Sequence, residues 1–203
     1  VAGMFVYPPT YRVYTEWYGF APGALSFAKF GVLATFGEMI VARLRTGRYH
    51  PAGSGLVPKA LVWGVLGVLI WVAFGVFSRG VPATFFADVS QPKPVMQVII
   101  AFSISFWMNL FFAPVMMMTH HLTDTYIHAN GGRFPLRSFA VRPLVGAIDW
   151  DRMWGFVFKK TIPLFWIPAH TVTFLLPEEL RTLFAVVLSV VLGLLLTVGR
   201  KAA

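Results

Sequence analysis

The sequence lacks cysteine altogether and is poor in acidic residues. None of its 203 residues is a cysteine, so disulfides, thiolate nucleophiles and zinc–thiolate centres are excluded within it. Asp and Glu number 8 against 17 Lys and Arg, which gives a formal net charge of +9. Nucleophile elbows, phosphate-binding loops, paired catalytic carboxylates and dinucleotide fingerprints are also missing. We therefore expect a protein that is not an enzyme and that needs no cofactor.

Charged residues are scarce as well, and apolar residues take their place. Only 12% of the chain is charged and 57% is hydrophobic, against about 25% and 45–50% in soluble domains. The mean hydropathy is +0.70. A soluble chain of this length could not bury so much apolar surface. The composition predicts an all-α, polytopic transmembrane helical bundle, with one bundle domain over residues 24–201.

Five apolar stretches approach the length of about 20 residues that a membrane crossing requires. The predicted spans are 24–42, 60–77, 95–118, 155–176 and 180–198. Pro163 and Pro168 interrupt the fourth of them, so four spans plus a broken or re-entrant segment remain an alternative. The third helix is expected to continue beyond the bilayer to about His128, before the stop signal Asn130-Gly131-Gly132.

The basic residues are concentrated in alternate loops. The first and third loops carry four and six Lys or Arg, and the second and fourth carry two and one. With five spans, the basic loops and the basic C-terminus face the cytoplasm or the matrix, with the N-terminus opposite. Basic loops also suit anionic lipid such as cardiolipin, and we expect the bilayer, not nucleic acid, as the partner. The candidates for lipid contact are Arg43, Arg45, Arg48, Arg133, Arg137, Lys159 and Lys160.

Residues 1–23 form a separate segment that is rich in aromatic side chains and too polar to span a membrane. Its rings include Tyr11, Tyr14, Trp17 and Tyr18. Amphipathic rings gather at the boundary between membrane and water. The segment therefore lies along that boundary, or it packs on a partner protein.

Two polar residues stand inside predicted spans. Glu38 lies deep in the first span, and a carboxylate at that depth is either functional or the partner of a basic side chain on a neighbouring helix. Asn109 lies in the third span, where an amide either joins helices or lines a pore. Whether His170 of the fourth span faces Glu38 decides if these two residues form the centre of the bundle.

A histidine cluster near the end of the third helix is a weak candidate for a metal site. His121, Asp124 and His128 recur at i, i+3 and i+7, which places them on one helical face. Two imidazoles and a carboxylate could bind a metal ion. The alternative, which we favour, is that these side chains meet water where the helix leaves the membrane.

The fourth span carries a stripe of aromatic and polar residues. Trp166, His170, Thr173, Phe174 and Pro177 recur at helical spacing, and Arg181 follows four residues later. This stripe resembles the W-x-x-x-Q-x-x-N-F motif of the Mpv/PMP family of mitochondrial inner-membrane and peroxisomal proteins. His170 and Thr173 replace the motif's Gln and Asn.

Two further segments resemble the same family. Gly37-Glu38-Met39-Ile40 is similar to its Gly-Asp-aliphatic-Ile segment, with Glu38 in place of Asp. Asn109 and the run up to Pro114 are similar to an Asp-Gln segment that leads into a proline. Order and spacing agree over about three quarters of the chain.

The resemblance implies a non-enzymatic membrane protein with four spans, in some members a weakly selective channel. Its implied location is the mitochondrial inner membrane, with the peroxisomal or bacterial inner membrane as alternatives. Glu38, Asn109, His170 and Thr173 would then face the bundle interior. The alternative function is a structural accessory subunit of a larger, respiratory-type inner-membrane complex, bound to other membrane subunits.

Overall fold

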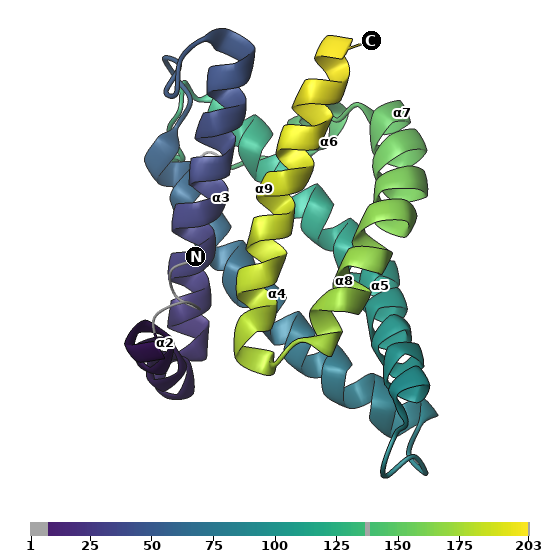
Figure 1. Ribbon diagram of the computed structural model, residues 1–203. Coiled ribbons are helices and arrows are strands. Elements are labelled where there is room, and N and C mark those ends of the chain that lie inside the picture. The colour runs from purple at the N-terminus through teal and green to yellow at the C-terminus, as the bar shows by residue number, and fades with distance from the viewer. Residues whose placement is uncertain (1–7, 137–138, 203) are drawn as a thin grey trace.

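The chain folds into a bundle of helices that run alternately in opposite directions (Figure 1). The structure is a computed structural model that describes residues 8–136 and 139–202. Within those ranges the secondary structure is all helical. Its elements are α2 (Pro8–Phe20), α3 (Pro22–Thr46), α4 (Leu56–Phe85), α5 (Pro94–Ala129), α6 (Val141–Gly146), α7 (Trp150–Arg152), the π-helix η2 (Met153–Trp166), α8 (Ile167–Leu175) and α9 (Glu178–Ala202).

Four helices in the described ranges are long and apolar enough to cross a membrane. They are Pro22–Thr46, Leu56–Phe85, Pro94–Ala129 and Glu178–Val198, with 25, 30, 36 and 21 residues. They contain the first, second, third and fifth of the predicted spans. The α5 helix ends at Ala129, which agrees with the predicted extension to about His128.

The predicted fourth span, 155–176, is divided between two elements. The π-helix η2 covers its first part and α8 its second. Pro163 lies inside η2 and Pro168 in the first turn of α8. Each proline lacks an amide hydrogen and its ring crowds the preceding turn, which disfavours a regular α-helix here. Because neither element alone has the length of a span, the count of five remains a prediction.

Proline and glycine set the helix boundaries. Pro22 occupies the first turn of α3, where its missing amide hydrogen costs nothing. Gly47 ends the same helix at φ 78°, a left-handed conformation that glycine adopts without strain. A Cβ on Gly132 would come within 2.9 Å of the Gly53 carbonyl oxygen, so the end of α5 packs directly on the loop between α3 and α4.

The core lies where α3, α4, α5 and α9 meet. Each contributes at least one almost fully buried apolar residue, among them Phe30, Leu66, Met108 and Val186. Close approach depends on small residues, because a Cβ on Gly67 would lie 2.6 Å from the Cβ of Phe30. Small residues at helix contacts are typical of membrane bundles, which lack a hydrophobic drive between helices.

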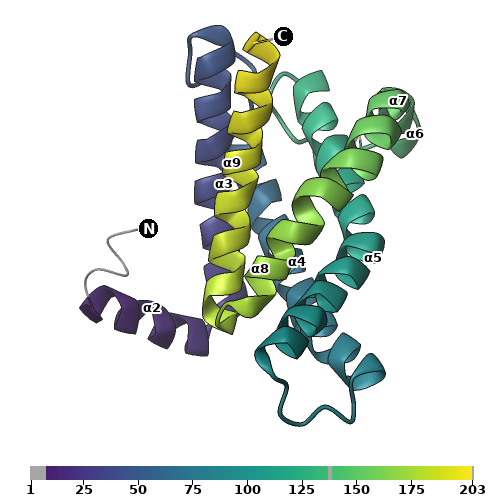
Figure 2. The ribbon, with the colours of Figure 1, turned by 45° about the vertical axis from the view of Figure 1, so that its right-hand side comes forward.

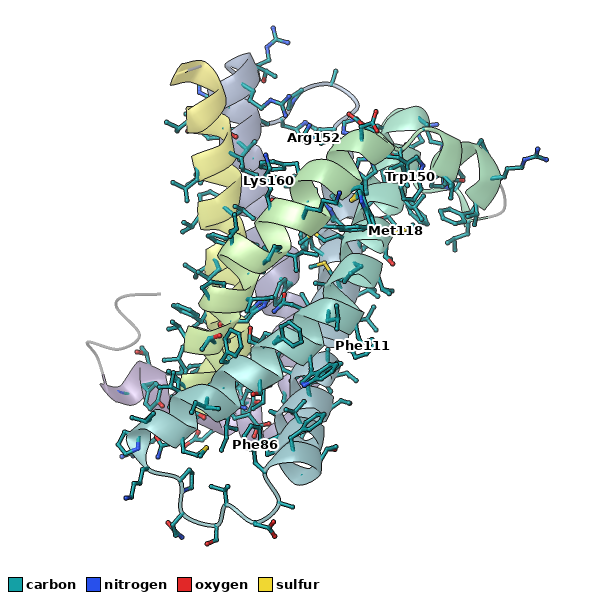
Figure 3. All side chains as sticks on the ribbon, turned by 90° about the vertical axis from the view of Figure 1, so that its right-hand side faces the viewer. Phe86, Phe111, Met118, Trp150, Arg152 and Lys160 are labelled. Carbon is teal, nitrogen blue, oxygen red and sulfur yellow. The ribbon has the colours of Figure 1, made fainter. Side chains whose placement is uncertain are left out.

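The two ends of the bundle differ in charge. The C-terminal ends of α3, α5 and α9 lie together (Figure 1), and we call this the basic end. Arg152 and Lys160 lie toward that end, whereas Phe86 lies at the opposite end (Figure 3). There α2 extends crosswise to α3 (Figure 2). This arrangement places the first and third loops on one side, as the charge pattern predicts.

Candidate functional site

Three helices each contribute one charged side chain to an ionic cluster near the basic end. Lys59 of α4 lies 3.0 Å from Glu38 Oε2 of α3 and 2.5 Å from Asp124 Oδ1 of α5. Only 14% of the Lys59 side chain is exposed, against about a third of each carboxylate. A single ammonium therefore joins two carboxylates that are far apart in the sequence.

Two aromatic side chains complete the surroundings of Glu38. The indole Nε1 of Trp63 donates a hydrogen bond of 2.7 Å to Glu38 Oε1. His120 Nε2 lies 3.6 Å from the same oxygen, and its ring contacts the Trp63 ring at 4.3 Å between centroids. Since Lys59 and Trp63 are four residues apart on α4, both reach Glu38 from one helical face.

The cluster forms part of the wall of a cavity of about 670 Å³, which we call the vestibule. Residues of α3, α4, α5 and α9 line it. The polar lining includes Thr35, Glu38, Arg45, Lys59, His120 and Asp124. Thr35, Glu38 and Arg45 lie at i, i+3 and i+10 on α3, so one helical face carries a hydroxyl, a carboxylate and a guanidinium toward the basic end. This volume can hold several waters or a small organic solute.

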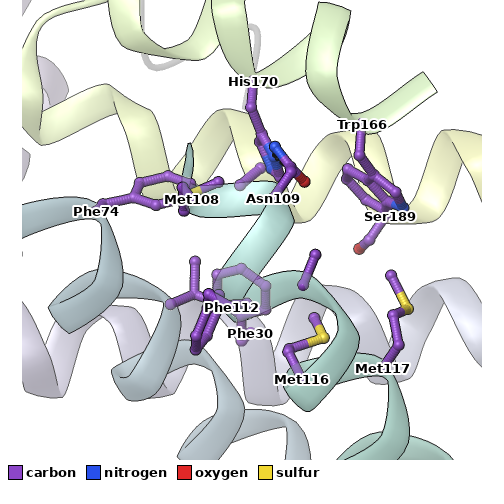
Figure 4. A pocket seen from close by; sticks show the side chains of 13 residues that line it. Phe30, Phe74, Met108, Asn109, Phe112, Met116, Met117, Trp166, His170 and Ser189 are labelled. Atoms are coloured by element: carbon purple, nitrogen blue, oxygen red, sulfur yellow. Dashed lines mark hydrogen bonds between the residues drawn. The ribbon is translucent and has the colours of Figure 1, made fainter. Parts of the chain in front are cut away.

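A second polar pair lies in the middle of the bundle. His170 of α8 and Asn109 of α5 point toward one another (Figure 4), with 3.1 Å between His170 Nδ1 and Asn109 Nδ2. Asn109 Nδ2 also donates to the Ser105 carbonyl oxygen at 2.8 Å. The His170 ring stacks on Trp166 at 5.1 Å between centroids. His170 therefore pairs with Asn109 instead of Glu38, and the two polar clusters are separate.

Apolar side chains fill the space around this pair. The remaining cavity has a volume of about 40 Å³. Its lining includes Phe30, Phe74, Met108 and Trp166 (Figure 4), and we call these four residues the central barrier. Ser189 of α9 lines both this small cavity and the vestibule. The vestibule thus ends at a packed apolar layer.

The other residues of the fourth-span stripe fulfil packing roles. Thr173 is fully buried and donates to the Ala169 carbonyl oxygen. Phe174 is buried and contacts the Phe74 ring at 5.2 Å between centroids. Arg181 donates to the carbonyl oxygen of Leu176 at 3.1 Å, which satisfies a backbone acceptor beyond the end of α8. Pro177 separates α8 from α9, and Pro114 lies inside α5.

The structure does not gather the candidate metal ligands His121, Asp124 and His128. Asp124 is directed to Lys59, and His128 Nε2 lies 3.9 Å from the other Asp124 oxygen. Among the residues that the structure describes, no group of three or more His, Asp or Glu is arranged to hold a metal ion. His121, Asp124 and His128 recur at helical spacing in the sequence. In the folded chain, however, the Asp124 carboxylate forms an ion pair with the ammonium of Lys59.

Most lipid-contact candidates lie on exposed positions. Arg43, Arg45, Arg48, Lys159 and Lys160 are exposed, and Arg133 is accessible near the end of α5. Arg43 lies over the Tyr49 ring and Lys159 over the Trp154 ring, at 5.5 Å and 5.8 Å from the centroids. Arg137 lies outside the described residues.

At the opposite end, α2 is held by tyrosines. Tyr11 and Tyr18 donate to the carboxylates of Glu179 and Glu178, at 3.0 Å and 3.4 Å. Tyr14 donates to the Glu179 carbonyl oxygen. Burial raises the pKa of Tyr14 well above its usual range, and the hydrogen bond to Glu179 raises the pKa of Tyr11. One face of α2 therefore docks on the beginning of α9.

A buried lysine lies beneath these tyrosines. Lys29 of α3 is 8% exposed and donates to Thr182 Oγ1 at 2.5 Å and to Tyr14 Oη at 3.1 Å. Its ammonium also lies 5.4 Å from the Tyr14 ring centroid. Its hydrogen-bond partners are thus neutral hydroxyls.

Sequence reasoning missed three side chains that contact Glu38, namely Lys59, Trp63 and His120. Lys59 was assigned to a basic loop, but α4 begins at Leu56 and turns Lys59 into the vestibule. Trp63 lies in an apolar stretch and His120 in a run of polar residues, so neither stands out in the sequence. The available signal was the four-residue spacing of Lys59 and Trp63 together with an unpaired Glu38 on the preceding helix.

Comparison with known proteins adds no relative: no family model, no curated protein and no solved structure matches the chain.

Proposed function

We propose that this protein forms a pathway for small solutes across a membrane, and that the structure represents its closed state. The vestibule, with the ion pairs of Glu38, Lys59 and Asp124 on its wall, is the observation that carries this proposal. Of these residues Glu38 lies inside a predicted span, where an ionisable side chain is costly and usually marks a substrate or ion pathway. The central barrier would have to move aside for a solute to pass.

The resemblance to the Mpv/PMP family supports the same proposal. Glu38 and Asn109 correspond to polar positions of that family, and they lie in the two polar clusters. We extend the proposal to an inner membrane, of a mitochondrion or a bacterium, on the strength of this resemblance. The basic end would face the matrix or the cytoplasm.

Planar-bilayer recordings with the purified protein test the proposal. We expect discrete current steps from the wild type and an altered conductance from Glu38→Gln, because that change removes a charge from the vestibule wall. Glu16→Gln, at an exposed position of α2, is the matched control and should leave the conductance unchanged. Electrically silent membranes with both wild type and Glu38→Gln would refute the pathway.

One observation favours a second function, that of a structural accessory subunit. The middle of the bundle is packed so fully that only about 40 Å³ remains open. A scaffold requires such packing, whereas in a pathway these side chains must move apart before a solute can pass. Migration on native gels in mild detergent distinguishes the two functions, because a scaffold subunit remains in a larger complex and a pathway protein migrates alone or as a small oligomer.

A further inference from the structure

The ionic cluster contains more negative than positive charge. Two carboxylates, Glu38 and Asp124, contact the single ammonium of Lys59. The nearby imidazoles of His120 and His128 carry charge only when they are protonated. Arg45 lies two helical turns from Glu38, about 10 Å along the axis, at an exposed position. The ionic cluster thus has one negative charge that no fixed cation of the cluster balances, and the nearest other fixed cation on the vestibule wall is that of Arg45.

The cluster also shows which kind of cation it accommodates. Lys59 presents a primary ammonium, and carboxylates from α3 and α5 bind it at 3.0 Å and 2.5 Å. The rings of Trp63 and His120 lie beside these groups, and an aromatic face attracts cations. A ligand with its own ammonium group would meet the same chemistry at the accessible part of Asp124.

A free hydroxyl lies in the same cavity. Thr35 is 6% exposed and lines the vestibule one turn from Glu38 on α3. Its Oγ1 is buried and has no hydrogen-bond partner among the described residues. A buried hydroxyl without a partner costs free energy, and a bound polar molecule removes that cost.

We propose that the vestibule binds small solutes that carry a protonated amine, with the ammonium held at the carboxylates beside Lys59 and a further polar group at Thr35. This inference rests on the proposed pathway and names the chemical class of its solute. The vestibule, at about 670 Å³, admits a solute of several heavy atoms together with water. Anions are disfavoured at the ionic cluster because its two carboxylates outnumber its one fixed cation.

A gradient of ethylammonium acetate across a planar bilayer tests the preference directly. The sign of the reversal potential shows whether the cation or the anion carries the current. We expect ethylammonium to be favoured over acetate by about tenfold, because the unbalanced carboxylate of the ionic cluster attracts the cation and repels the anion. Asp124→Asn should bring this ratio close to one, because it removes the excess charge but leaves the Lys59–Glu38 pair. Asp88→Asn, at an exposed loop position of the opposite end, is the matched control.

Thermal unfolding in detergent supplies an independent measure of binding. Ethylammonium and ethanolamine chlorides should raise the unfolding temperature of the wild type, and tetramethylammonium chloride, which cannot donate a hydrogen bond, should not. Thr35→Val keeps the side-chain shape and should lose the additional effect of ethanolamine over ethylammonium. This second variant is informative even if Asp124→Asn fails to fold.

The outcomes separate the two proposals. Current without a preference for ethylammonium, or with the same preference in Asp124→Asn, overturns the amine inference and leaves the pathway intact. Stabilisation by the amines without any current overturns the pathway and retains an amine site. Absence of both current and stabilisation overturns both.

Discussion

The two ends of the bundle each bury a lysine, and they do so by opposite means. At the basic end, Lys59 contacts two carboxylates from neighbouring helices beside a large cavity. At the other end, Lys29 contacts the hydroxyls of Thr182 and Tyr14 beneath the docked helix α2. The residue type is the same, but one lysine belongs to an ionic network and the other to a covered, neutral contact.

This difference indicates what each end can do. Charged groups that remain accessible to a cavity can exchange partners with water or a solute. A lysine that is covered by an additional helix is closed off, and its partners fix the position of α2 on α3 and α9. In the proposed pathway, solute contact belongs to the basic end, and the end that carries α2 is closed by the docked helix.

The largest effect is expected from breaking the ionic network. Lys59→Met leaves Glu38 and Asp124 facing one another without a cation. Removal of one member of a buried ion pair typically costs 3–5 kcal/mol, and the partial exposure of both carboxylates places our expectation near the lower limit, at about 3 kcal/mol. The free energy of unfolding in mixed micelles measures the loss.

Two further variants sharpen the test of Lys59. Lys93→Met, at an exposed position of the loop before α5, should change the stability very little. Adding Asp124→Asn to Lys59→Met should recover part of the loss, because only one carboxylate then remains unpaired. A loss below about 1 kcal/mol, the range of exposed ion pairs, would show that the network is a surface feature and would remove the contrast between the ends.

A smaller, local effect is expected at the α2 end in alkaline solution. Burial is the main cause that raises the pKa of Tyr14 and of Tyr18 above the ordinary value of 10.0. The docked state therefore keeps these protons longer than the undocked state. Docking is complete below about pH 10 and weakens as the pH rises toward the higher, folded-state pKa.

A spin label can report this release of α2. The chain has no cysteine, and a side chain at Gly19 would meet no other atom within 4 Å, so Gly19→Cys offers a unique labelling site. Label mobility should rise above about pH 10 in this background, and Tyr14→Phe should move the transition. Lys29, Glu178, Glu179 and Arg181 also face the tyrosines, and a transition that is unchanged by Tyr14→Phe would assign the release to one of them.

The sequence predicted the helices better than it predicted the site. Pro94 and the Asn130-Gly131-Gly132 stop mark α5 because they act on the local backbone. Trp166, His170 and Phe174 share one helical face, as their spacing predicts, because they lie within about two turns, from the end of η2 into α8. The π-helix η2 escaped prediction, since two prolines signal a disturbed helix but do not specify its hydrogen-bond pattern.

The site depended on contacts between distant segments. Glu38 and Asn109 were recognised because polar residues in apolar stretches are conspicuous. The partners of Glu38 were not recognised, because Lys59 lies at a span boundary where a lysine is ordinary, and His120 belongs to a polar run. Only the folded chain shows that α3, α4 and α5 bring Glu38, Lys59 and Asp124 within ion-pair distance.

The smallest effect is expected from Lys29→Met, the counterpart of Lys59→Met at the other end. Its loss leaves no polar group stranded, because Thr182 Oγ1 retains Ser26 Oγ at 3.5 Å and Tyr14 retains the Glu179 carbonyl oxygen. The methionine also avoids the cost of burying an ammonium without a carboxylate. We expect a change in the free energy of unfolding of within about 1 kcal/mol, in either direction. The same micelle assay checks it, and a loss as large as that of Lys59→Met would show that charge, and not coverage by α2, stabilises this end.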